Sequence, residues 1–264
     1  MSPLNRRLVL RRAAHRFAAP SRAGRPGRVN NARTDVGRAP IVAVPGLGLS
    51  AEFCNRTLDR LSGPSAVVLL PGFGLPAGRD APRSPRELAQ LLFAHLDDLG
   101  YARVILSGHS ASCQVIVQAA AQAPGRVEAL ILVGPTTDPR ARDWPSLLAR
   151  WLRTAVWERP GQVPLLLRDY WRTGIAAMAR GIDAARKDRI DHVLTAVDAP
   201  VLIVRGPHDH ISPRRWVDNL AAASQHGQAE TLSAGAHMLP FTHPDALAAR
   251  IDAFLTVAAA TPRS

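Results

Sequence analysis

The sequence predicts an α/β protein with a mostly parallel sheet and helices on both faces, because short apolar runs alternate with helical patterns. At 264 residues the chain fits one domain of this class. The apolar runs lack polar alternation, as expected of strands that are buried on both sides. The predicted strands span residues 41–44, 66–70, 102–107, 127–133, 201–205 and 229–232.

The helix predicted between the second and third strands has signals at both ends. Ser84 is a typical N-cap, Pro85 suits the first helical position, and Glu87 completes a capping box. Gly100 can adopt the left-handed conformation that ends a helix. Side chains at helical spacing predict one apolar face, formed by Leu88, Leu91, Leu92, His95 and Leu99.

The alternation of strands and helices breaks over residues 137–196, where the pattern is helical and includes four of the five tryptophans. We expect this segment to be an inserted helical cap over the carboxyl ends of the strands, where open α/β sheets bind ligands. Residues 39–136 and 197–260 then form the core. The cap side chains expected to bind substrate are Trp144, Trp151 and Trp171.

Composition favours a water-soluble globular protein. Apolar residues make up 47 % of the chain, and no apolar run approaches the roughly 20 residues that a membrane-spanning helix needs. Cys54 and Cys113 lie far apart and fit neither a disulfide framework nor a zinc site, which favours a reducing, cytoplasmic location. We therefore expect a small-molecule substrate and no membrane partner.

The first 38 residues are strongly basic. They hold ten arginines and one acid, Asp35, and so carry +9 of the formal net charge of +12. Because the rest of the chain is nearly balanced, the charge does not indicate a nucleic-acid partner. We expect residues 1–38 to form a disordered, solvated tail; an arginine-rich organellar targeting signal is the alternative.

A nucleophile motif follows the third predicted strand. Gly108-His109-Ser110-Ala111-Ser112 lies between that strand and an apolar, helix-compatible stretch at residues 113–123. This context of strand, turn and helix is typical of a nucleophile elbow, in which a small residue two places before the serine lets a strained turn close. An ordinary strand-to-helix turn is the alternative interpretation.

Two further polar residues follow later strands. Asp209 comes soon after the strand at 201–205, and His237 lies beyond the strand at 229–232, so both are expected at the same sheet edge as Ser110. A serine hydroxyl needs a base to take its proton, and the base needs a third group to orient it. The sequence therefore predicts Ser110 as nucleophile, His237 as base and Asp209 as acid.

Together these motifs resemble those of the α/β-hydrolase superfamily, particularly its capped, esterase-like members, over about residues 40–258. Pro45-Gly46-Leu47-Gly48 is similar to the family's oxyanion loop, which implies an oxyanion hole formed by the backbone N–H groups of Leu47 and Ala111. Pro71-Gly72-Phe73-Gly74 is similar to the family's next loop, which implies that Phe73 walls the substrate pocket. Ser112 stands where the family usually has glycine. This departure implies a crowded helix–strand contact.

Three alternatives concern the polar residues. Asp138, after the strand at 127–133, is a second candidate acid, because some members of the resembled family use that loop. The pair of histidines around Asp209 could indicate a metal site, but a hydrolytic zinc centre needs further histidines in matching loops. We therefore expect no metal and no cofactor. His109 and His243 are expected to have packing or surface roles.

The predicted activity is that of a serine hydrolase, which cleaves an ester-like bond of a small, mainly apolar substrate through an acyl-enzyme intermediate. Hydrolysis of a lactone, a thioester or a carbon–carbon bond stays open, because each reaction passes through a similar oxyanion. A ligand-binding, receptor-like protein on the same fold is the alternative from another class, since one fold hosts many functions.

Overall fold

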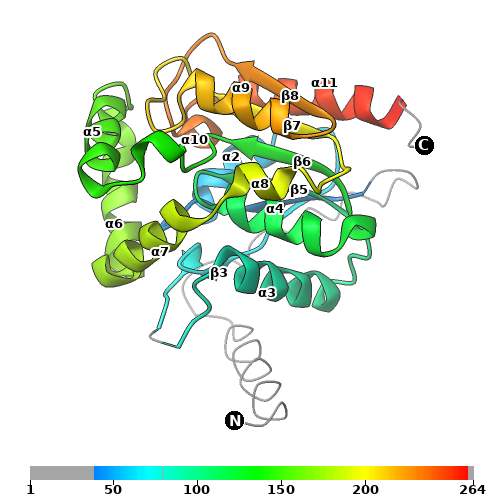
Figure 1. The fold of residues 1–264 in the computed structure, drawn as a ribbon, viewed down its shortest axis with the longest axis horizontal. Helices are drawn as coiled ribbons and strands as arrows, with labels where there is room; N and C mark the ends of the chain where they lie inside the picture. The colour runs from blue at the N-terminus through cyan, green and yellow to red at the C-terminus, as the bar shows by residue number, and fades with distance from the viewer. Residues whose placement is uncertain (1–38, 79, 261–264) are drawn as a thin grey trace.

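A six-stranded parallel sheet forms the centre of the protein (Figure 1). The computed structural model describes residues 39–78 and 80–260, so the expected tail at 1–38 lies outside the described residues. The strand order is β2-β1-β5-β6-β7-β8, and each neighbouring pair is parallel. The strands are β1 (Ile41–Val44), β2 (Ser65–Val67), β5 (Val104–His109), β6 (Val127–Val133), β7 (Val201–Arg205) and β8 (Gly227–Thr231).

Most predicted strands are confirmed, but the second run, 66–70, is divided. Its first part belongs to β2, whereas Leu70 begins β3 (Leu70–Pro71), which pairs with β4 (Gly74–Leu75) in a separate two-stranded sheet. The chain reverses at Gly72, whose φ of 83° suits glycine, and the Leu70 N–H donates to the Phe73 carbonyl at 2.9 Å. The end of the run therefore belongs to this small sheet and not to the central one.

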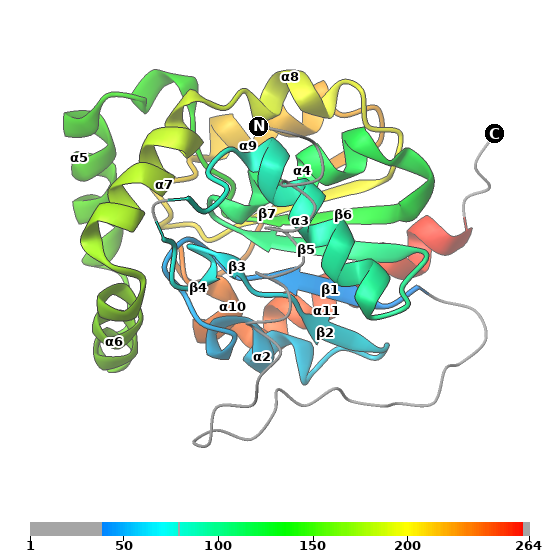
Figure 2. The ribbon, with the colours of Figure 1, turned by 90° about the horizontal axis from the view of Figure 1, so that it is seen from below.

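Helices cover both faces of the sheet, as Figure 2 shows from below. Two buried apolar clusters lie between the sheet and these layers. One face carries α3 (Pro85–Asp98), α4 (Ser112–Gln122), α8 (Ile190–Leu194) and α9 (Arg214–Ala223). The other carries α2 (Glu52–Leu58), α10 (Leu239–Thr242) and α11 (Pro244–Ala260).

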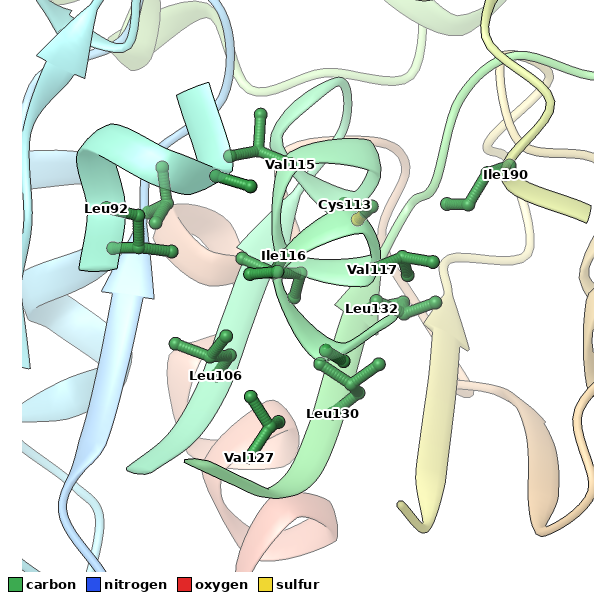
Figure 3. Close-up of a cluster of buried hydrophobic side chains, with 14 of the residues drawn as sticks. Leu92, Leu106, Cys113, Val115, Ile116, Val117, Val127, Leu130, Leu132 and Ile190 are labelled. Atoms are coloured by element: carbon green, nitrogen blue, oxygen red, sulfur yellow. The ribbon is translucent and has the colours of Figure 1, made fainter. Parts of the chain in front are cut away.

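The helix that follows Ser110 is packed deepest in the core. In α4 the side chains of Val115, Ile116 and Val117 are fully buried, and Figure 3 shows them among Leu106 of β5 and Leu132 of β6. Burying an aliphatic side chain of this kind contributes about 1.5–3 kcal/mol. The helix that follows the nucleophile motif is therefore tightly packed against the sheet.

The predicted signals of α3 are confirmed at both ends. Ser84 accepts from the Glu87 N–H at 3.2 Å within a capping box, and Gly100 has a φ of 74°. The predicted apolar face is wrong at one position, because Leu99 is 48 % exposed while Leu96 is fully buried. The helix ends at Asp98, so Leu99 lies past its last turn and no longer faces the core.

Residues 137–196, which we call the cap segment, contain no strand; their first three α-helices lie beyond one end of the sheet, whereas α8 packs on the core (Figures 1 and 2). No helix in the described part of the chain has the length and apolar character required to cross a membrane. Besides α8, the helices of the cap segment are α5 (Trp144–Ala155), α6 (Val163–Thr173) and α7 (Ile175–Lys187).

Candidate active site

Ser110 occupies a strained turn between β5 and α4. Its φ is 58°, and no other non-glycine residue in the described ranges has a positive φ. Its N–H donates to the Val133 carbonyl at 2.9 Å, which fixes the turn against β6. A Cβ at Gly108 would lie 3.0 Å from the Cys113 nitrogen, so the turn needs a glycine there. This geometry matches the elbow predicted from the sequence.

Ser112, the departure from the family pattern, is accommodated without crowding. Its side chain is fully buried, and Oγ accepts from the His109 N–H at 2.8 Å. The same hydroxyl lies 2.8 Å from the Val44 carbonyl, to which it can donate. Ser112 therefore ties the elbow to the end of β1.

His237 and Asp209 form a buried pair. The Nδ1–H of His237 donates to Oδ2 of Asp209 at 2.8 Å, and the two side chains are 7 % and 0 % exposed. The other carboxylate oxygen of Asp209 accepts from the Ser212 N–H at 2.9 Å. A Cβ at Gly134 would lie 3.0 Å from Nδ1 of His237, so the loop after β6 passes directly against the pair. Both carboxylate oxygens of Asp209 therefore accept a hydrogen bond.

The electrostatics of the pair favour an ionised Asp209 carboxylate and a protonated His237 imidazole. Burial alone would raise the pKa of Asp209, but the His237 charge and hydrogen bond, with the Ser212 N–H and Arg205, bring it below its ordinary value. Burial alone would lower the pKa of His237, and the Asp209 charge and hydrogen bond more than offset this, so that pKa is raised. The carboxylate thus stays ionised where the imidazole titrates.

His109 has the packing role that was expected of it. Its Nε2–H donates to the His237 carbonyl at 2.9 Å, and the two rings lie 4.9 Å apart between centroids. Burial, together with the neighbouring His237, lowers the pKa of His109 to about 3, so this ring is neutral at physiological pH. A Cβ at Gly46 would lie 2.8 Å from its Nδ1.

The loop after β1 approaches the elbow through Leu47. In the turns that the structure describes, neither the Leu47 N–H nor the Ala111 N–H donates to a backbone carbonyl. Gly48 has a φ of 75°, and its N–H donates to the Gly72 carbonyl at 2.7 Å. A Cβ at Gly181 would lie 2.6 Å from Leu47 Cδ1, so α7 of the cap segment contacts this loop.

Asp138, the alternative acid, is bound to the cap segment instead of to His237. The Arg150 Nη2 donates to Oδ2 of Asp138 at 2.7 Å, and Oδ1 of Asp138 accepts from the Arg140 N–H at 3.1 Å.

His208, one of the two histidines beside Asp209, stacks on Trp157 with 3.8 Å between ring centroids. This histidine beside Asp209 thus packs against an aromatic ring of the cap segment.

The four predicted substrate-binding side chains differ in exposure. Phe73 is 5 % exposed within the core, whereas Trp171 is 86 % exposed. Trp144 and Trp151 are 46 % and 47 % exposed. The contact of all four with substrate stays a prediction.

Two acidic residues of the cap segment, which the sequence analysis did not single out, hold loops of the site. Oε1 of Glu158 accepts from the N–H groups of His237, at 2.7 Å, and Met238, at 2.9 Å. Oδ2 of Asp169 accepts from the Ser50 N–H at 2.8 Å. Each bond joins residues far apart in the sequence.

The hydroxyl of Thr154, also in the cap segment, binds a third loop of the site. Thr154 is 2 % exposed, and its Oγ1 accepts from the His210 N–H at 3.0 Å. Arg150, Thr154 and Glu158 follow one another at intervals of four residues, which is the spacing of one helical face. Arg150 and Thr154 lie on α5 whereas Glu158 follows it, so this spacing does not by itself indicate which loops the three side chains bind.

Comparisons with known proteins agree with this fold. The model of the alpha/beta hydrolase family matches residues 41–250. A search of curated proteins finds no match. Among solved structures, the chain is similar to a hydrolase from Oleispira antarctica, with 15 % identity, a TM-score of 0.72 and coverage of 83 % of this chain and 92 % of that one.

Two further structures share the fold. An enol-lactonase from Burkholderia xenovorans LB400 has 21 % identity and a TM-score of 0.66, with coverage of 83 % of this chain and 92 % of that one. A thermophilic esterase from Thermogutta terrifontis has 16 % identity and a TM-score of 0.64, with coverage of 84 % and 91 %. With its family model matched over most of its length, the chain belongs to the alpha/beta hydrolase family.

Proposed function

We propose that this hydrolase uses Ser110, His237 and Asp209 as a catalytic triad to cleave an ester-like bond. The observation that carries the proposal is the buried His237–Asp209 pair, with 2.8 Å between Nδ1 and Oδ2. Ser110 supports it, because this residue lies in a strained turn directly after His109, whose ring donates to the His237 carbonyl. A carboxylate that holds Nδ1–H fixes the tautomer in which Nε2 can accept a proton. That is the arrangement that a serine nucleophile requires.

The proposed reaction has two halves. Oγ of Ser110 bonds to the carbonyl carbon while Nε2 of His237 takes the hydroxyl proton, and the carbonyl π electrons move to oxygen. The Leu47 and Ala111 N–H groups stabilise that oxyanion. Its collapse expels the alcohol, which receives the proton from His237. Water then repeats the sequence on the acyl-enzyme and releases the acid.

We further propose a small, mainly apolar substrate. Leu47, on the loop after β1, and the tryptophans of the cap segment supply apolar surface, and burying each substrate methylene contributes about 0.8 kcal/mol. The similar folds of an esterase and an enol-lactonase support esters and lactones as the first compounds to test. A cytoplasmic location belongs to the same proposal, because Cys54 and Cys113 are free and buried.

Labelling by a fluorophosphonate, followed by mapping of the modified residue, tests the nucleophile. We expect modification at Ser110, and Ser110→Ala should abolish labelling and reduce kcat by about 10³-fold or more while Tm is retained. Ser146→Ala, on α5, is the matched control and should label like the wild type. Equal labelling of Ser110→Ala would rule out the proposed nucleophile.

A receptor-like protein is the competing function, and burst kinetics separate the two. With an activated p-nitrophenyl ester, a hydrolase releases nitrophenol steadily after any burst, whereas a receptor would acylate once and stop. Sustained turnover that depends on Ser110 therefore supports hydrolysis.

A further inference from the structure

We propose that Glu158 of the cap segment is a positioning residue, which fixes the backbone at His237 and thereby holds the imidazole against Asp209. The inference rests on the proposed function. Glu158 lies 79 residues before His237 and follows α5 in the chain. It is neither part of the predicted triad nor part of the predicted oxyanion hole.

The carboxylate of Glu158 is held in one orientation. Oε1 accepts from two successive N–H groups, at 2.7 Å from His237 and 2.9 Å from Met238. Oε2 accepts from Nε2 of Gln162 at 2.9 Å, and Gln162 is 1 % exposed. Charge-assisted hydrogen bonds to a carboxylate are roughly twice as strong as neutral ones. Glu158 therefore constrains the direction in which the His237 backbone points.

The segment that carries His237 needs such a constraint. It leaves β8 through Gly235, whose φ of 99° is a conformation that glycine adopts freely. The His237 carbonyl is held by Nε2 of His109 at 2.9 Å, and its ring is held by Asp209. Glu158 supplies the remaining backbone contact, so the base is fixed through its N–H, its carbonyl and its ring.

Glu158 also changes the charge around the base. Its carboxylate adds to the effect of Asp209 in raising the pKa of His237. Positioning and charge can be separated, because a glutamine at 158 keeps an oxygen that accepts both N–H groups but removes the negative charge. Other charged or titratable side chains near this site include Tyr170, which interacts with Glu158, and also Asp209, His109, Arg205, Arg159 and His243.

The link has a consequence for the cap segment. Because Glu158 belongs to that segment, any movement that lifts residue 158 breaks both bonds to the base-carrying loop. The position of the cap segment and the competence of His237 are thereby coupled.

The test compares Glu158→Gln, Glu158→Ala and the control Asp143→Asn in the full chain. Asp143 caps the N-terminus of α5 by accepting from the Ser146 N–H at 2.9 Å, so its variant removes a carboxylate from the opposite end of the helix that Glu158 follows. With p-nitrophenyl butyrate we expect Glu158→Ala to lose roughly 10- to 100-fold in kcat, with a smaller change in KM. Glu158→Gln should recover most of that loss, and Asp143→Asn should behave like the wild type.

An NMR titration of the His237 ring supplies a readout that does not depend on turnover. The pKa of His237 should fall in Glu158→Gln and stay unchanged in Asp143→Asn. Wild-type kcat in Glu158→Ala would overturn the positioning role, and an unshifted titration in Glu158→Gln would overturn the effect of the Glu158 charge on His237. A protein without esterase activity would refute the proposed function, while the NMR titration would still decide whether Glu158 acts on His237.

Discussion

The core and α5 of the cap segment make their contacts with opposite kinds of side chain. In β6 the side chains of Leu130, Ile131 and Leu132 are 0 % exposed, so the core is held by buried apolar area. In α5, Leu148 is 58 % exposed while Thr154 is buried and bonded to the core. The difference teaches that α5 is attached by a few directional bonds and the core by many non-directional contacts, which α8 at the other end of the cap segment joins.

The two regions also contribute different things to the site. The core places Ser110, His237 and Asp209 at one edge of the sheet. The cap segment holds two loops of the site: Asp169 binds the loop after β1, and Glu158 binds the loop after β8, which carries His237. Substitutions in the core should therefore alter stability or chemistry directly, whereas those in the cap segment should act through loop geometry.

The largest contrast is expected between the two candidate acids. Asp209→Asn should lower kcat by about 10⁴-fold, because the amide favours the wrong tautomer of His237. Asp138→Asn should retain most of the activity, since Asp138 bonds to Arg150 of the cap segment. Steady-state kinetics on an activated ester measure both.

The ranking of these two variants is the decisive outcome. Circular dichroism and Tm show whether each variant is folded, which keeps unfolding from imitating loss of the acid. A larger loss in Asp138→Asn than in Asp209→Asn would move the acid to the loop after β6.

Stability should separate the core from the cap segment next. Leu132→Ala, at a fully buried position in β6, should lower the free energy of unfolding by about 2–5 kcal/mol. Leu148→Ala, at a position 58 % exposed in α5, should change it by no more than about 0.5 kcal/mol. Urea unfolding measures the difference. Equal losses would show that α5 packs through its apolar side after all.

Local signals predicted most of the fold. The strands β1, β6 and β7 have their predicted ends, because each is a short apolar run bounded by turn residues. The capping box of α3 likewise needs only four adjacent residues. The order of the three triad candidates followed from placing each after a strand, and their approach to one edge follows from parallel topology.

Contacts between distant segments were not predictable in the same way. Glu158 and Asp169 bond to backbone N–H groups, and any residue except proline offers such a group, so the partner leaves no mark in the sequence. Helical spacing indicates which side chains of α5 share a face, but not whether that face meets the core or solvent. The exposure of Trp171 and Leu99 could therefore be learned only from the structure.

The smallest expected effect is a shift in pH dependence. Catalysis requires neutral His237, and the pKa of this ring is raised above 6.5 because the Asp209 charge and hydrogen bond outweigh the effect of burial. More than half of the free enzyme is then protonated at pH 6.5, so kcat/KM at that pH should lie below half of its plateau. His109 does not contribute to this acid limb, since its pKa is about 3. A substrate without ionisable groups keeps the profile free of other titrations.

In Asp209→Asn the residual activity should have its acid limb at lower pH, because the negative charge that favours the imidazolium is gone. The limb of Glu158→Gln should move in the same direction, which would show that a carboxylate of the cap segment tunes a base of the core. A wild-type acid limb below pH 6.5, or a limb that moves upward in Asp209→Asn, would contradict this account of the pair.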